Sequence, residues 1–550
     1  MRKRRGTAAF LAMVMVLSLA LAACSGNGTK NESTSGNATG ENAQESNDAG
    51  YQTTYGSKQF DDVTLTVELF DRSNAPQGST VLNNKWVQYA QEEMKKVGIN
   101  LEFVAVPRSE EITKIQTMMA AGTAPDIVLT YTRSIAEDYF TQGGTHDLSP
   151  YIDGDDQAVN LKNYLGENVL NVARNGDGDL WAVSARRASA TKNNLFIRKD
   201  WLDKLGMEIP TTTDELYEVL KAFKDNNPDG RDDIIPYFSV TIGEETADRV
   251  DVLSTSFMTS IMDDTEFNIK SVFPVYSDEG YAEYLRYLNK LYNEGMIDQE
   301  YYTSNDYTAL VQEHVVNGRV GVFEFNVNGN VDNLRGGLLQ NLKANNPDAD
   351  IVAMPPLLNN HDGEMYNILY AANGAYCIVP KTCANPEAAV TYMDWLATAE
   401  GGFALYHGFE GEHYELEDGV PIVIDAEYNA LDKDWTRHDM FLVGNQGYFF
   451  SEEDFVKSAS KEIPEYEEYV FKNYEYAMAG NAKNTTAYTS PTQSANIAEI
   501  QLAVDEYLVK CITCPPEDFD DMLAAYKNAL KNAGMDTVIE ERTAYYEALQ

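Results

Sequence analysis

Hydrophobic positions near the start of the chain predict strands that alternate with helices. Valine and leucine occupy every second position from 63 to 69, the pattern of a strand with one buried face. Apolar residues then recur at helical spacing from 82 to 97, and Gly98 ends that helix. A strand is predicted over 99–106, a helix over 112–119 and a strand over 127–130. This order indicates right-handed crossovers and a mostly parallel sheet of the α/β class.

The middle of the chain contains a helix start followed by a loop rich in side-chain oxygens. Thr212 lies three residues before Glu215, the spacing of a capping box that opens a helix. This helix runs into residues 225–233, where Gly230 permits a sharp turn and the flanking side chains suit a hard cation such as calcium. The predicted ligands of a structural calcium ion are Asp225, Asn227, Asp229, the carbonyl of Arg231, and Asp233.

A different interpretation of this loop stays open at the level of sequence. An EF-hand closes with an acidic residue at position 12, but Pro236 stands there. The alternative is therefore an acidic turn that ends the helix. If calcium does bind, the predicted role is stability and not catalysis.

The first 60 residues have the pattern of an export signal and a tether. Residues 2–5 are basic, and an apolar run from 8 to 23 ends at Cys24. This run is short for a membrane span, so residues 1–23 are predicted to be cleaved. The sequence Leu-Ala-Ala-Cys resembles a bacterial lipobox, whose cysteine receives the lipid; the alternative is an ordinary signal with an incidental Cys24. Residues 24–60 contain few aliphatic side chains and predict a disordered tether.

Length and charge limit the classes of partner. About 490 residues remain after the tether, more than one core usually supports, so two lobes are expected. The chain has 86 acidic and 42 basic residues and a formal charge of -44. A body so acidic is repelled by nucleic acid and by anionic lipid, which excludes nucleic-acid binding.

Residues for catalysis and for cofactors are not evident. The motifs of zinc proteases, serine hydrolases, P-loop proteins and dinucleotide-binding proteins are missing, and the six histidines have no metal-pair spacing. We therefore expect no enzyme activity and no organic cofactor. The later cysteines are predicted to be small buried residues or reduced thiols, with a local disulfide as the alternative for the last two; they are Cys377, Cys383, Cys511 and Cys514.

Several blocks of sequence resemble the extracellular solute-binding proteins of bacterial ABC carbohydrate importers. The similarity is to the large lipoproteins that include oligosaccharide and alginate binders. The blocks are Ala124–Val128, Asn194–Gly206, Pro210–Leu216, Asn317–Val322, Ile378–Lys381 and Asn385–Asp394. Members of this family also carry a calcium loop at the position of residues 225–233. They often close it with Glu after the last Asp, where Ile234 stands in this chain.

The resemblance implies a two-lobe, type II periplasmic-binding-protein-like fold, in which a ligand lies in the cleft and the lobes close about a hinge. Each lobe is discontinuous in sequence. The expected first lobe comprises 61–188 and 373–410, and the second 189–372 and 411–550. The connecting segments are expected near 184–193, 367–374 and 407–424.

Residues at the ends of predicted strands and near the crossings are the candidates for ligand contact. They are Thr130, Tyr131, Arg133, Trp181, Arg186, Glu324, Phe325, Asn326, Trp435 and Arg437. Neutral sugars bind aromatic platforms flanked by polar side chains, and 34 tyrosines favour such a site only slightly. Arginines at 133, 186 and 187 would suit an acidic sugar if they line the cleft, so neutral and acidic glycans both stay open.

The sequence thus predicts a lipid-anchored receptor on the outer face of the cell membrane. It would be a monomer that captures an oligosaccharide and delivers it to ABC permease subunits. The alternatives are a binder of a non-sugar solute such as a peptide, and an extracellular glycan-degrading enzyme.

Overall fold

The structure is a computed structural model that describes residues 59–239, 250–304, 307–327, 331, 337–484 and 488–548. The chain divides into units of residues 1–49 and 50–550, and all described residues belong to the second unit. The predicted signal, Cys24 and nearly all of the tether lie outside the described residues. Within the described ranges, every helix is too short or too polar to cross a bilayer.

The first lobe is built around a mixed sheet. β1 (Val63–Asp71) pairs in parallel with β2 (Ile99–Pro107) along nine positions. A bridge between Val67 and Ile127 connects β1 to β3 (Val128–Thr130). β10 (Asn373–Ile378) lies between β3 and β4 (Val183–Arg187), antiparallel to both, and β13 (Gly444–Asn445) runs parallel to β4. The predicted strands are present, but the sheet is mixed because β10 returns from the second lobe.

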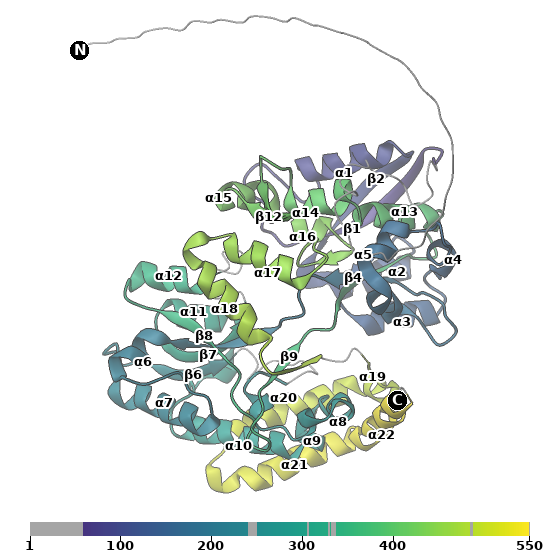
Figure 1. Cartoon of the computed structure of the whole chain (residues 1–550). Coiled ribbons are helices and arrows are strands. Elements are labelled where there is room, and N and C mark those ends of the chain that lie inside the picture. The colour runs from purple at the N-terminus through teal and green to yellow at the C-terminus, as the bar shows by residue number, and fades with distance from the viewer. Residues whose placement is uncertain are drawn as a thin grey trace, which may run out of the picture. The chain divides into compact units, whose positions relative to one another are not determined.

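Helices surround this sheet, and their ends follow local rules (Figure 1). Asn84 caps α1 by accepting the amides of Trp86 and Val87, each at 3.0 Å. Gly98 (φ 80°) ends the following turn, where a Cβ would lie 1.9 Å from the carbonyl oxygen of Phe60. The helices of this lobe are α1 (Lys85–Lys95), α2 (Glu111–Ala121), α3 (Arg133–Thr141), α4 (Ser149–Ile152), α5 (Val159–Leu170), α13 (Pro386–Leu396), α14 (Ala404–His407), α15 (Ala426–Asn429) and α16 (Arg437–Met440). β11 (Tyr414–Glu417) and β12 (Val420–Val423) form a hairpin.

The second lobe has its own four-stranded sheet in the order β6-β7-β5-β8. β5 (Asn193–Arg198) is antiparallel to β7 (Val320–Asn326) and to β8 (Ile351–Met354), whereas β6 (Ile235–Ser239) and β7 are parallel. Alongside, β9 (Tyr366–Leu369) pairs in parallel with β14 (Asn481–Asn484). Two lobes with separate sheets match the predicted fold class.

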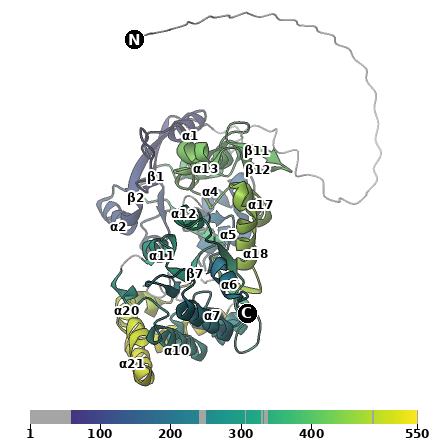
Figure 2. The same cartoon turned by 90° about the vertical axis from the view of Figure 1, so that its left-hand side faces the viewer.

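Helices of the second lobe cover this sheet and extend beyond it. The predicted capping box opens α7 (Thr213–Asn226), since the Thr212 hydroxyl accepts the Glu215 amide at 3.1 Å. α10 (Glu279–Asn293), α20 (Ile497–Thr513) and α21 (Phe519–Asn532) pack together at the end of the molecule opposite α1 (Figures 1 and 2). The others are α6 (Lys199–Leu205), α8 (Asp264–Lys270), α9 (Pro274–Ser277), α11 (Tyr307–Val316), α12 (Leu338–Asn345), α17 (Glu452–Lys461), α18 (Glu467–Ala477), α19 (Pro491–Ala495) and α22 (Met535–Glu547).

Three chain segments connect the lobes side by side, and we call them the hinge: residues 188–192, 370–372 and 446–451. The Tyr370 amide donates to the Ala190 carbonyl at 2.8 Å, and the Ala188 amide donates to the Asn445 carbonyl at 3.0 Å. The expected crossings and lobe bounds stay predictions. Residues 437–445 pack against the first sheet, because β13 pairs with β4 and α16 contacts β1.

Candidate functional site

A cavity of about 400 Å³ opens where the two lobes face each other. Its wall includes side chains from loops that follow strands of both sheets. The lining residues are Arg72, Asn74, Tyr131, Asn326, Val327, Tyr406, His407, Tyr414, Pro421, Val423, Lys433, Asp434, Trp435, Arg437, His438, Asp439, Asn445, Gln446, Phe449, Phe455, Ser458, Ala459, Glu462 and Tyr474. The volume lies within the range of small-molecule sites.

Strand ends bring the two sides of this cavity together. Arg72 directly follows β1 and Tyr131 directly follows β3, both at carboxyl ends of strands in the first sheet. Asn326 is the last residue of β7 in the second sheet. Between them, α17 contacts the β12 hairpin of the first lobe and α18 contacts β5 and β8 of the second. Ligands of open α/β folds bind at such strand ends.

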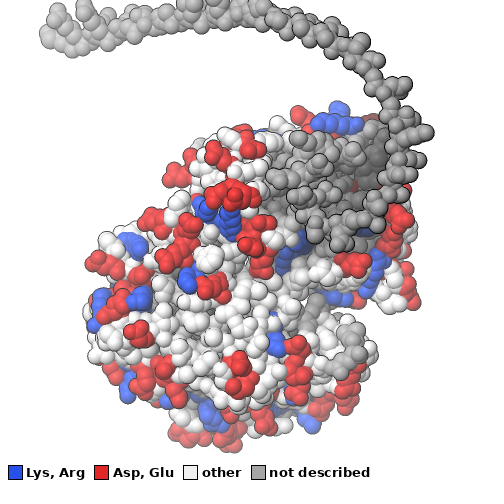
Figure 3. Space-filling model, in the orientation of Figure 1, with Lys and Arg blue, Asp and Glu red and all other residues white. Residues whose placement is uncertain are grey.

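Cations in the cavity wall are paired with carboxylates. Arg72 holds Asp439 through two nitrogens, with contacts of 2.8 to 3.1 Å. Burial raises the pKa of Asp439 above its usual value despite this pairing. Asp434 pairs with Lys433 and, at 2.9 Å, with Arg437. The wall therefore has opposite charges side by side, on a surface where acidic residues are widespread (Figure 3).

Burial and the neighbouring charges also set the protonation states of Asp434 and Lys433, which lie beside Arg437. Burial would raise the pKa of Asp434, but the nearby Arg437 and Lys433 charges outweigh it and hold the pKa below its usual value. Burial and the Arg437 charge lower the pKa of Lys433 to about 8. Lys433 is thus mostly charged at neutral pH, and the three side chains carry a net charge of about +1 there.

Aromatic side chains supply the apolar part of the cavity. Tyr131 is 36% exposed and stacks on Phe70, with ring centroids 6.2 Å apart and planes at 18°. Trp435 is 7% exposed, and its indole Nε1 has no hydrogen-bond partner among the described residues. An exposed ring face and an unpaired N–H group match the C–H faces and hydroxyls of a sugar.

Four of the ten predicted ligand residues line this cavity: Tyr131, Asn326, Trp435 and Arg437. Arg133 lies outside the lining and pairs with Glu137 at 3.1 Å, with its guanidinium 5.4 Å from the centroid of the Trp181 ring. Arg186 donates to the carbonyl oxygens of Tyr164 and Phe450 and lines a separate hollow. A ligand role for these two arginines stays a prediction.

The other four predicted residues are buried behind the cavity wall. Thr130 is fully buried and donates to Glu111 at 2.6 Å. Trp181 is also fully buried, with its ring 5.2 Å from that of Tyr376. Burial, together with the nearby Asp251 charge, raises the pKa of Glu324 well above its usual value, and Phe325 is 4% exposed. In this conformation these four support the wall and do not face the cavity.

Several lining residues were not among the sequence predictions. Arg72 follows the end of a predicted strand, so the rule that selected Tyr131 would also have selected it. Tyr406 and Phe449 come from segments in which the sequence pattern gives no sign of the cavity. Phe449 follows β13, which pairs with β4 at the edge of the sheet opposite β3.

Protein cations contact two of the carboxylates in the predicted calcium loop. Asp229 accepts hydrogen bonds from Arg198 at 2.9 Å and Lys204 at 2.6 Å. Asp233 accepts from Arg231 at 2.9 and 3.0 Å. Among the described residues, the acidic side chains of this loop do not form a cluster of three His, Cys, Asp or Glu ligands. A calcium ion at this loop stays a prediction.

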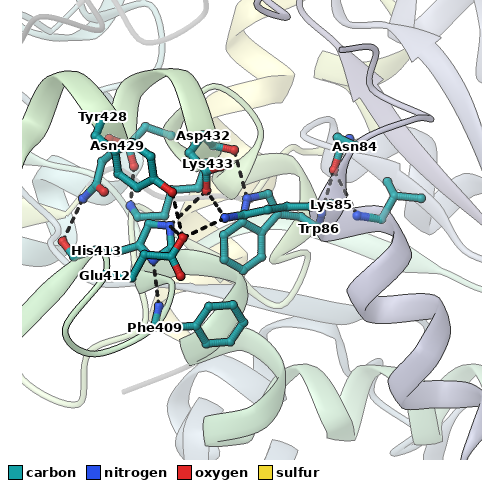
Figure 4. Close-up of polar contacts among 12 residues, drawn as sticks. Asn84, Lys85, Trp86, Phe409, Glu412, His413, Tyr428, Asn429, Asp432 and Lys433 are labelled. Carbon is teal, nitrogen blue, oxygen red and sulfur yellow. Dashed lines mark hydrogen bonds and ion pairs between the residues drawn. The ribbon is translucent and has the colours of Figure 1, made fainter. Parts of the chain in front are cut away.

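One group of described side chains does bring metal-type ligand atoms within 4.8 Å of one another: Glu412, His413 and Asp432 (Figure 4). Lys85 contacts Asp432 at 2.5 Å and Glu412 at 3.3 Å. His413 accepts the Phe409 amide at Nδ1, so its proton is at Nε2, 2.9 Å from Asp432. Each ligand atom already has a protein donor or acceptor, so this group connects α1 to the segment after α14.

Comparisons with known proteins agree with this architecture. The chain is 25% identical to lipoprotein LipO of Bacillus subtilis, over 61% of this chain and 66% of LipO. It is 24% identical to the polygalacturonan/rhamnogalacturonan-binding protein YtcQ of Bacillus subtilis, over 68% of the chain and 72% of YtcQ. These alignments span about two thirds of each relative.

Solved structures and a family comparison extend the similarity to the fold. The alginate-binding protein AlgQ2, solved without calcium ion, superposes with a TM-score of 0.61 at 17% identity, over 88% of this chain and 98% of AlgQ2. Residues 78–403, more than half of the chain, match the family described as bacterial extracellular solute-binding proteins. The chain belongs to the family of bacterial extracellular solute-binding proteins.

Proposed function

We propose that this chain captures an oligosaccharide in the cavity between its lobes and delivers it to the permease of an ABC importer. The observation that carries the proposal is the cavity itself, in which an exposed Tyr131 ring and the unpaired N–H of Trp435 meet polar side chains of both lobes. A sugar presents C–H faces and hydroxyls together, and these are the partners that such a wall selects. Relatives named for binding polygalacturonan and alginate agree with a glycan.

The proposal includes the division and placement of the chain. We infer a first lobe of residues 61–188 and 373–445 and a second lobe of 193–369 and 452–550, joined by the hinge. Closure about the hinge would bury the ligand and present both lobes to the permease. Cys24 is the proposed lipid attachment point on the outer face of the membrane. Calcium at residues 225–233 is not part of the proposal, because protein cations contact Asp229 and Asp233, two of the three predicted carboxylates.

A thermal-shift screen of the full chain against neutral and acidic oligosaccharides tests this function. A ligand at one hundred times its Kd adds about 2.7 kcal/mol of stability, which raises the Tm measurably. We expect a rise with at least one class of glycan, and intact glycan when the mixture is analysed afterwards. No rise across the panel would contradict the proposal, and cleavage of the glycan would indicate an enzyme instead.

Removing the exposed ring tests the site. Tyr131→Ala takes away the platform and should weaken glycan binding about tenfold, since one stacking contact is worth about 1–2 kcal/mol. Tyr302→Ala is the control, because Tyr302 is similarly exposed, at 45%, and does not line the cavity.

A further inference from the structure

Two cations of the hinge lack the carboxylate partners that the other cations near the cavity have. Arg187 ends β4 and is half-buried; its Nε donates to the Asn373 carbonyl oxygen at 2.9 Å. Lys192 ends the first connecting segment. Neither side chain forms an ion pair with a carboxylate among the residues that the structure describes. In a chain with 86 acidic and 42 basic residues, two cations without carboxylate partners are unexpected.

The two cations share one aromatic ring. The guanidinium carbon of Arg187 lies 4.2 Å from the centroid of the Tyr370 ring, and Lys192 Nζ lies 5.5 Å from it. A cation and an aromatic face attract each other, which offsets part of the cost of burial but leaves the positive charge uncompensated. Glu324 is the nearby acid; burial, together with the charge of Asp251, raises its pKa well above the usual value, while the nearby Lys192 charge acts to lower it.

Backbone pairing places both cations next to the cavity wall. Arg187 is directly opposite Asn445 in the β4–β13 ladder, and Asn445 lines the cavity. The Val327 amide donates to the Lys192 carbonyl at 3.1 Å, and Val327 lines the cavity from the other lobe. Arg187 is also close enough to interact electrostatically with Tyr131. Arg187 itself lines the separate hollow that Arg186 lines, and Lys192 adjoins the cavity through its backbone contact with Val327.

Each cation of the wall itself contacts a carboxylate, although Lys433, Asp434 and Arg437 together keep a net charge of about +1. Arg72 is taken up by Asp439 through both nitrogens, and Arg437 shares Asp434 with Lys433. A ligand that bears a negative group would have to displace Asp439 or Asp434 to reach them. Arg187 and Lys192 can receive such a group without breaking an existing ion pair.

We propose that Arg187 and Lys192 form the anion-binding part of the site, so that the captured oligosaccharide carries a carboxylate, as uronic acids do. This inference rests on the proposed capture function. A planar guanidinium matches a carboxylate through two parallel hydrogen bonds, and the ammonium of Lys192 adds a second positive charge. The acidic surface repels an anionic sugar only over short distances, because salt screens charges beyond about 8 Å.

Isothermal titration of the full chain with paired ligands tests this inference. The ligands are galacturonate, mannuronate and glucuronate oligosaccharides, each compared with its methyl ester, which has the same skeleton without the charge. We expect at least one acid to bind tenfold or more tightly than its ester, and this preference to weaken at high salt. Esters or other neutral glycans that bind as tightly as the acids would overturn the inference and leave the capture function standing. No binding by any glycan would overturn both.

Substitutions at Arg187 and Lys192 test which side chains provide the positive charge for the acidic glycan. Arg187→Gln should abolish the preference for the acid over its ester, and Arg187→Lys should retain part of it. Lys192→Met should reduce it. Arg174→Gln is the matched control: it removes one guanidinium from the same lobe, at a pair with Asp153 outside the cavity lining, and should leave the preference unchanged. A preference that survives Arg187→Gln in a folded protein would overturn the assignment.

Discussion

The loop at residues 225–233 and the hinge both gather positive side chains in a strongly acidic chain, yet they use them differently. In the loop, Arg198 pairs with both Asp200 and Asp229, and every cation is neutralised by a nearby carboxylate. In the hinge, Arg187 and Lys192 face an aromatic ring and have no carboxylate partner among the described residues. Paired cations hold the fold, whereas unpaired ones are available to a ligand.

The largest effect is expected from breaking the buried pairs of the loop. The Arg198 side chain is only 1% exposed. Arg198→Met removes this buried cation from Asp200 and Asp229 and should lower the free energy of unfolding by about 3–5 kcal/mol. Urea unfolding measures the change. Arg286→Met removes an exposed pair with Asp520 and should cost within about 1 kcal/mol. Equal effects of the two changes would contradict the structural role of Arg198.

A buried acid without a cation partner among the described residues extends the comparison. Glu68 is fully buried in β1, and burial raises its pKa to about 8. Its folded pKa lies above the unfolded one, so its stabilising contribution is complete below about pH 4.5 and is lost as the pH rises to about 8. Glu68→Gln, which does not titrate, should therefore gain stability over the parent through this range.

The size of that gain is about 1.4 kcal/mol for each unit between the two pKa values. Thermal unfolding of both proteins from pH 5 to 9 measures it, with a plateau expected above about pH 8. A difference between the two proteins that does not change with pH would show that Glu68 is not a buried, uncompensated acid.

Arg187→Gln separates the two kinds of cation directly. Because the Arg187 side chain forms one hydrogen bond among the described residues, to the Asn373 carbonyl oxygen, its loss should change the free energy of unfolding by about 1 kcal/mol or less. The affinity for an acidic glycan should fall by a larger factor, about tenfold or more. Urea unfolding and titration calorimetry give the two numbers. A loss of stability as large as that of Arg198→Met would remove the distinction.

The smallest effect is expected from metal removal. If protein cations hold residues 225–233, a chelator should shift the Tm by less than about 1 °C. Added calcium should also leave the Tm unchanged, because a ligand stabilises the folded state only if it binds to that state. Asp229→Asn serves as the comparison, since it should destabilise the loop with or without chelator. A clear fall in Tm on chelation would restore the calcium prediction.

Local signals predicted elements of both lobes. The alternation over 63–69, the helical spacing over 82–97 and the capping box at Thr212 each depend on neighbours within a few residues, and the structure has β1, α1 and α7 there. The pairing of β13 with β4 was not predicted, because it joins positions more than 250 residues apart. No local pattern contains that information.

The ligand site was predicted only in part, because its geometry also depends on contacts between distant parts of the chain. Tyr131 and Asn326 stand at strand ends, where a rule about open α/β sheets applies, and both line the cavity. Trp181 follows no strand end, and its full burial depends on packing against Tyr376 from another part of the chain. The calcium prediction rested on oxygen spacing and on the family resemblance, and neither reveals that Lys204 of α6 and Arg198, the residue before α6, contact Asp229.

A crystal structure of the chain with its tightest-binding glycan tests the central claim most directly. The account predicts one oligosaccharide in the cavity, with a ring against Tyr131, a hydrogen bond from the indole of Trp435 and a carboxylate at Arg187. A glycan bound elsewhere on the protein, or density for a hydrolysed product in its place, would contradict it.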